Sequence, residues 1–165
     1  MPGTLPPALH IALLTYRGNP QSGGQGVYTH YLSRELVALG HRVTVFSGQP
    51  YPVLGPGVEL VAVPSLDLYR AEDPFRTPAR HEFRDAVDVL EFAVMCGAGF
   101  PEPLTFSLRA RRELRAWSGR FDVVHDNQCL GYGVLGIARR NPGTGCRGRR
   151  RTGPTTPAAP AWPGG

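Results

Sequence analysis

The sequence predicts an α/β fold in which a parallel, doubly wound sheet is flanked by helices. Short apolar runs alternate with longer segments whose apolar residues recur at helical spacing, and this alternation is typical of parallel sheets. Turns rich in glycine and proline separate the runs. The chain has 165 residues, which is enough for one hydrophobic core and hardly for two.

The first part of the chain contains three expected strands and one helix. The apolar run 10–16 predicts a buried strand, and the β-branched run 41–48 predicts a second one. The alternating run 58–64 predicts a third strand. Between the first two strands, Gly40 stands where a C-cap glycine is expected. The apolar positions before it recur at helical spacing: Val27, Tyr31, Leu32, Leu36 and Leu39.

Residues 77–118 are expected to be mostly helical, in two segments separated by the Gly-Ala-Gly-Phe-Pro break at 97–101. The run 121–127 predicts a fourth strand, and a further helix is expected to begin within 130–140. The apolar face expected for the first helical segment consists of Phe83, Val87, Leu90 and Val94.

After residue 140 the composition changes abruptly. Residues 141–165 contain no Leu, Ile, Val, Phe, Met or Tyr, and 11 of these 25 residues are Gly or Pro, so this segment cannot bury enough apolar surface to fold. We therefore expect a domain at 9–140 and a disordered tail at 141–165. GC-rich DNA translated out of frame gives such an Arg/Pro/Gly/Thr/Ala mixture, and we favour that origin over a genuine disordered linker.

Charge and cysteine content exclude several classes of protein. All 18 basic residues are Arg; residues 141–165 hold four of them and no acid, so the rest has 14 Arg against 13 acids. This near balance predicts no nucleic-acid partner. Three cysteines without a Cys-x-x-Cys motif support neither a disulfide framework nor a metal site. No signal sequence or membrane span is apparent, and a cytoplasmic location is expected.

A glycine-rich loop lies between the first expected strand and its helix. Gly23, Gly24 and Gly26 fall at the sheet edge where α/β proteins bind ligands. Glycine lets the backbone approach a ligand closely, and the free amides of a helix N-terminus favour an anion. The pattern therefore predicts a phosphate, a diphosphate or an acidic acceptor near this loop.

Two common phosphate-binding motifs do not fit this loop. The spacing in this loop is Gly-Gly-x-Gly and not the Gly-x-Gly-x-x-Gly of the dinucleotide fingerprint, and the second strand ends in Phe46-Ser47-Gly48 where an acidic residue would be expected. The Walker motif needs a lysine, and the chain has none. A nicotinamide dehydrogenase and a nucleoside triphosphatase are therefore disfavoured.

The stretches SGGQGVYTHYLSRELVALGHRVTVFSG (22–48) and FDVVHDNQCLGYGVLGI (121–137) resemble the N-terminal half of family 4 retaining glycosyltransferases. The resemblance covers roughly residues 9–140 and implies a Rossmann-like sheet, one half of the two-domain GT-B fold. It implies metal-independent transfer of a sugar from a nucleotide diphosphate sugar to an acceptor, with retention and no cofactor. In that family the loop corresponding to Gly23, Gly24, Gln25 and Gly26 lies at the donor diphosphate and the acceptor.

The resemblance also implies site residues at the end of the fourth strand. His125 matches the first position of a His-x-His pattern found in many members and is the candidate catalytic residue; Asn127 replaces the second histidine. Asp126 and Asn127 are expected to line the acceptor side of the cleft. After the helical break, members often contact the acceptor, which draws attention to Glu102, although core packing is expected for Phe100 and Phe106.

The family's second domain, with its basic pair and Glu-x7-Glu motif, has no counterpart in the sequence. The fold is therefore expected to be incomplete, and the chain inactive alone. The helical segment offers a basic face of Arg109, Arg112 and Arg115 that is compatible with a peripheral membrane contact. Two alternatives stay open: a non-enzymatic protein whose basic tail binds a polyanion or a protein, and another Rossmann-like enzyme such as a sugar epimerase.

Overall fold

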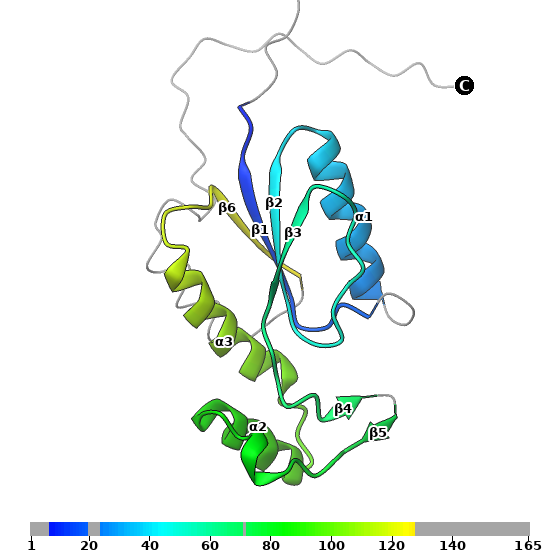
Figure 1. Ribbon diagram of the computed structural model, residues 1–165, viewed down its shortest axis with the longest axis vertical. Helices are drawn as coiled ribbons and strands as arrows, with labels where there is room; N and C mark the ends of the chain where they lie inside the picture. Colours follow the sequence, from blue (N-terminus) through cyan, green and yellow to red (C-terminus); the bar gives the residue numbers. More distant parts are fainter. Residues whose placement is uncertain (1–6, 20–23, 71, 128–165) are drawn as a thin grey trace, which may run out of the picture.

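The structure is a computed structural model that describes residues 7–19, 24–70 and 72–127. The chain alternates strands and helices around one sheet (Figure 1). The elements, in chain order, are β1 (His10–Thr15), α1 (Gly24–Ala38), β2 (Arg42–Ser47), β3 (Val58–Ala62), β4 (Tyr69–Arg70), β5 (Asp73–Pro74), a 3-10 turn (Arg80–Glu82), α2 (Ala86–Cys96), α3 (Glu102–Ala116) and β6 (Val123–Asp126). Gly23 and residues 128–165, which include the expected helix and tail, lie outside the described residues.

The four strands β3, β2, β1 and β6 form one parallel sheet in that order. β1 is central, with Leu13 beside Val45 of β2 and His125 of β6. The predicted parallel, Rossmann-like fold is confirmed, and each of the four strands expected within the described residues is present. The chain first adds strands on one side of β1 and later returns to the other side. The strand order therefore reverses between β1 and β6.

Alternate residues of the strands fill two cores, one on each face of the sheet. Ile11, Leu13, Val43 and Val45 form the first, against which Leu32 and Leu36 of α1 pack. The second core lies on the α3 face and consists of Ala12, Leu14, Phe46, Val63, Phe106, Ala110 and Leu114. Figure 1 shows α1 and α3 on opposite sides of the sheet. Burial on both faces explains why β1 and β2 read as continuous apolar runs.

Helix α1 ends as its sequence predicts, but the face that it buries differs in part. Gly40 has φ +86°, and its N–H donates to Val37, which makes a left-handed C-cap. The buried residues are small: Gly26, Thr29 and Ser33. These residues let the helix approach the sheet closely, whereas Val27 and Tyr31 of the helix, and Leu39 just beyond it, are exposed.

Helix α2 begins later than predicted and buries a different face. Asp85 caps it by accepting hydrogen bonds from the N–H groups of Val87 and Asp88, so the helix starts at Ala86. Its buried residues are Asp88 and Glu91, whereas Leu90 of the predicted apolar face is 38% exposed. The reason is electrostatic, because an arginine of α3 pairs with both buried carboxylates.

The short strands β4 and β5 form a small antiparallel sheet that the sequence patterns do not predict. This sheet lies in the connection between β3 and α2 (Figure 1). In the described ranges no helix is long and apolar enough to cross a membrane. The same ranges contain no group of three or more His, Cys, Asp or Glu side chains that could hold a metal ion.

Candidate functional site

The candidate site lies at the carboxyl ends of β1 and β6, where the strand order reverses. Open α/β sheets bind ligands at such a switch point, because the loops leaving the two neighbouring strands diverge to opposite faces and leave a crevice. Leu14 of β1 pairs with Asp126 of β6, and the N–H of Asn127 donates to the Leu14 carbonyl at 2.9 Å. The two segments singled out from the sequence therefore meet at one edge of the sheet.

The described glycines of the loop have different structural roles. A Cβ on Gly26 would lie 2.1 Å from the carbonyl oxygen of Asn19, so the first turn of α1 packs directly against the backbone of the preceding loop. Gly26 is therefore required by packing. A Cβ on Gly24 would meet no heavy atom within 4 Å. Gly24 thus borders open space at the helix N-terminus, where free amides favour an anion.

A cavity of about 430 Å³ opens at this position. The described residues that line it are Gly24, Gln25, Tyr28 and Asn127. Gly24 and Gln25 come from the predicted loop and Asn127 from the predicted strand end, so the structure brings both predicted parts together around one space. Among the described residues, the side-chain nitrogen of Asn127 is buried without a hydrogen-bond partner. This amide is a hydrogen-bond donor in the wall of the cavity.

His125 and Asp126 are not among the described residues that line the cavity. The imidazole of His125 lies instead beside Tyr28 of α1, with Nε2 3.4 Å from the tyrosine hydroxyl. The two rings stack with centroids 6.2 Å apart and an interplanar angle of 29°. Tyr28 was missed in the sequence. Its place near the start of a helix that follows the glycine loop could have indicated it, because a side chain there can reach the ends of the strands.

A second polar region lies on the α3 side of the same sheet edge. Arg17, two residues after β1, donates to the Tyr69 carbonyl at 3.0 Å and forms an ion pair with Glu102, the first residue of α3. Burial raises the pKa of Glu102 to about 7, although the positive charge of Arg17 acts against this. Phe106 lies in the core as expected, whereas Phe100 is exposed.

The basic face predicted on α3 does not exist as such, because Arg109 is buried. Its guanidinium donates to both Asp88 and Glu91 of α2. Arg112 and Arg115 remain exposed, and Arg112 lies 3.2 Å from Asp85. The prediction failed for Arg109 because sequence spacing cannot show that a neighbouring helix presents two carboxylates to it.

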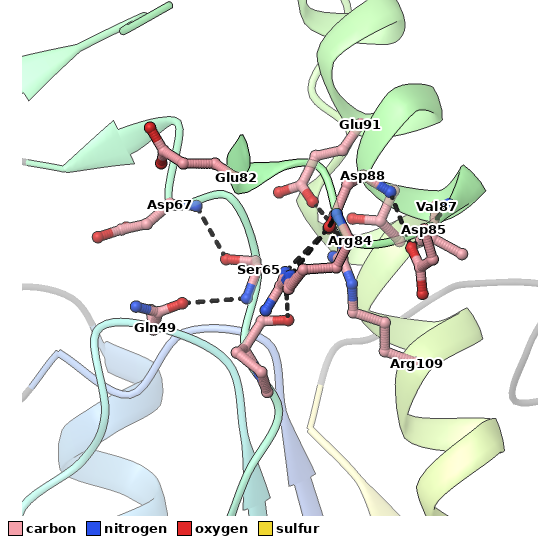
Figure 2. A network of polar contacts seen from close by, with 12 residues as sticks. Gln49, Ser65, Asp67, Glu82, Arg84, Asp85, Val87, Asp88, Glu91 and Arg109 are labelled. Atoms are coloured by element: carbon pink, nitrogen blue, oxygen red, sulfur yellow. Dashed lines mark hydrogen bonds and ion pairs between the residues drawn. The ribbon is translucent and has the colours of Figure 1, made fainter. Parts of the chain in front are cut away.

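The two carboxylates respond differently to this environment. Burial acts to raise the pKa of Asp88, but hydrogen bonds from the side chain and backbone of Arg84, together with Arg109, lower it to about 2. Burial raises the pKa of Glu91, and Arg109 only partly offsets it. Figure 2 shows Arg84 and Arg109 converging on Asp88. The network fixes α2 on α3.

A parallel sheet with a glycine-rich strand–helix junction and a cavity at the switch point defines the ligand-binding half of a Rossmann-like protein. The sequence matches the profile of Glycosyltransferase Family 4 over residues 22–149, and the chain belongs to this family. It is also 60% identical, over 132 residues, to the MMP alpha-(1->4)-mannosyltransferase of Mycolicibacterium hassiacum. The alignment covers 79% of this chain and 32% of that enzyme, so the chain spans about a third of the relative's length.

Proposed function

We propose that this chain forms the acceptor-side half of the catalytic cleft of a retaining glycosyltransferase. The reaction would transfer a hexosyl group from a nucleotide diphosphate sugar to an acceptor. The observation that carries the proposal is the cavity at the switch point, where the loop residues Gly24 and Gln25 face Asn127. Membership of family 4 supports the class of reaction and disfavours the sugar-epimerase alternative.

The residues have distinct proposed roles. The N-terminus of α1, with Gly24, Gln25 and Gly26, faces the donor diphosphate, because its free amides and dipole favour an anion; Gly23 is expected to continue this loop. Asp126 and Asn127 serve the acceptor side by hydrogen bonding to sugar hydroxyls. His125 contributes to the reaction from the end of β6, in contact with α1 through Tyr28.

We propose mannose as the transferred sugar. The relative is named as an α-(1→4)-mannosyltransferase, and 60% identity over 132 residues supports a similar site on the shared part. The chain alone is expected to be inactive, because the basic pair that in this family stabilises the leaving diphosphate belongs to the second domain and has no counterpart in the sequence. A cytoplasmic location and a peripheral membrane contact stay predictions, the latter now limited to the exposed Arg112 and Arg115 of α3.

A chimera tests the proposal. The 132-residue aligned segment of the Mycolicibacterium hassiacum enzyme is replaced by the corresponding segment of this chain. Mannosyl transfer is then measured with the relative's own donor and acceptor, beside the unaltered relative and the 165-residue chain alone. We expect the chimera to transfer mannose and the chain alone to be inactive. A chimera that folds, as judged by thermal unfolding, but transfers nothing would contradict the proposal.

A further inference from the structure

Tyr28 and His125 form a pair that links the N-terminal part of α1 to the end of β6. The two residues are 97 positions apart, and the tyrosine hydroxyl lies 3.4 Å from Nε2 of the histidine. The stacked arrangement of the rings holds them side by side. This contact crosses the same switch point at which the cavity opens.

The two members of the pair are placed differently relative to the cavity. Tyr28 lines it and is 45% exposed, whereas His125 is not among the described lining residues. Tyr28 therefore lies in the wall of a site that also contains the buried amide of Asn127. His125 contacts that hydroxyl from the strand side.

We propose that the Tyr28 hydroxyl contacts a hydroxyl group of the acceptor, and that His125 is a positioning residue that acts through Tyr28. This inference rests on the proposed function and refines it. His125 was the candidate catalytic residue in the sequence, and its placement assigns the direct contact to Tyr28 instead.

Hydrogen-bond chemistry favours a hydroxyl group of the acceptor substrate over a phosphate oxygen as the ligand of Tyr28. If Nε2 accepts from the tyrosine O–H, the phenol oxygen can only accept a further bond; if Nε2 carries the proton, the O–H is free to donate outward. A sugar hydroxyl both donates and accepts, so it suits either tautomer of His125. A diphosphate oxygen only accepts, and it suits one tautomer.

The length of the Tyr28–His125 contact agrees with a positioning role. At 3.4 Å it is a long hydrogen bond. Such bonds at catalytic sites often shorten when the substrate binds. An acceptor hydroxyl bound to the phenol oxygen would polarise the O–H group and strengthen its bond to the histidine.

The experiment uses the active chimera and a double-mutant cycle of Y28F, H125A and the double variant. H125Q is added because a glutamine amide can still accept from, or donate to, the tyrosine hydroxyl. Y31F is the matched control, since Tyr31 is an exposed tyrosine of the same helix whose ring contacts His30 and Arg34. Thermal unfolding of every variant separates misfolding from a change at the site.

We expect Y28F and H125A each to raise the KM for the acceptor roughly 3- to 10-fold, as for one neutral hydrogen bond, with little change in kcat. The double variant should be no worse than Y28F, because His125 is proposed to act only through the Tyr28 hydroxyl. H125Q should recover most of the loss, and Y31F should behave as the unaltered chimera.

Three results would overturn the inference. Additive effects would mean that the two residues act separately. A change confined to the KM for the donor would place Tyr28 at the phosphate. Loss of kcat in H125A and H125Q, with Y28F unaffected, would make His125 itself the reacting group. If the chimera that carries none of these substitutions is inactive, the proposed function is overturned, and this inference with it.

Discussion

The carboxylate of Glu102 lies 3.4 Å from the guanidinium of Arg17, with a side chain almost completely removed from solvent. Arg17 leaves the sheet just after β1, and Glu102 opens α3, so this ion pair joins the loop that leads to the glycines to the helix on the opposite face. Burial nevertheless raises the pKa of Glu102 to about 7. The pair is therefore sensitive to pH near neutrality.

The pKa of Glu102 gives the first prediction. Its folded value of about 7 lies above the ordinary value of 4.5, so the folded chain binds the extra proton between these pH values. The resulting stabilisation is complete below pH 4.5 and is lost as the pH rises through about 7, and it amounts to at most about 3 kcal/mol. E102Q should weaken this pH dependence, measured by urea unfolding at pH 5 and pH 8.

The exposed Glu35 provides a control for Glu102, and E35Q should leave the pH dependence unchanged. The raised pKa of Glu91 adds a dependence of the same sign, which should persist in E102Q. If the unfolding free energy changes equally between pH 5 and pH 8 in E102Q and in the unaltered chain, Glu102 is ionised throughout this range.

Arg109 carries the second prediction. R109M removes the cation that pairs with Asp88 and Glu91, which leaves buried Glu91 without this partner and Asp88 with Arg84. We expect a loss of roughly 3–5 kcal/mol in the free energy of unfolding, as for other broken buried ion pairs. R112M is the matched control, because Arg112 is 74% exposed and its pair should contribute less than about 1 kcal/mol. Similar values for both variants would refute the central role of Arg109.

The glycines of the loop give the third prediction, which separates packing from binding. G26A places a methyl group 2.1 Å from a backbone oxygen and should destabilise the chain by roughly 1–3 kcal/mol. G24A meets no atom and should leave the unfolding free energy nearly unchanged, while its methyl group, beside the cavity, lowers mannosyl transfer by the chimera. Full activity in G24A would argue against a ligand close to this backbone.

The fourth prediction concerns Asn127. N127D keeps the shape of the side chain but replaces the buried NH₂ donor by an oxygen and adds a negative charge beside the N-terminus of α1. We expect weaker binding of the anionic donor, seen as a rise of roughly tenfold or more in its KM in the chimera, because the new carboxylate repels the diphosphate proposed at the N-terminus of α1 and like charges ~4 Å apart near a protein surface interact by roughly 4 kcal/mol. An unchanged donor KM would place the diphosphate elsewhere.

The sheet, and the meeting of the two candidate segments at one end of it, could be predicted because they follow from local patterns. Continuous apolar runs indicate strands buried on both faces, and a glycine loop between the strand at 10–16 and its helix marks the ligand edge. Gly24, Gln25 and Asn127 accordingly line one cavity. The charged contacts of α2 could not be predicted, since the burial of Asp88 and Glu91 depends on Arg109, which lies 21 and 18 residues away in the chain.

The same limit applies to Tyr28. Helical periodicity predicts which residues share a face, but it does not say which face meets the sheet. Small residues at Gly26, Thr29 and Ser33 decide that orientation by close packing and turn Tyr28 toward the strand edge. Its partner, His125, lies 97 residues further on, so only the folded topology brings the pair together.

The central place of β1 determines when the site can form. β6 pairs with β1, and the N–H of His10 donates to the side chain of Asp122 across 112 residues of sequence. Contacts of such long range close large loops and are made late in folding. During synthesis from the N-terminus, β1, α1 and β2 can pair at once, whereas the ribosome must still deliver β6. The N-terminus of α1 can therefore form first, whereas the wall containing Asn127 must wait until β6 has been synthesised.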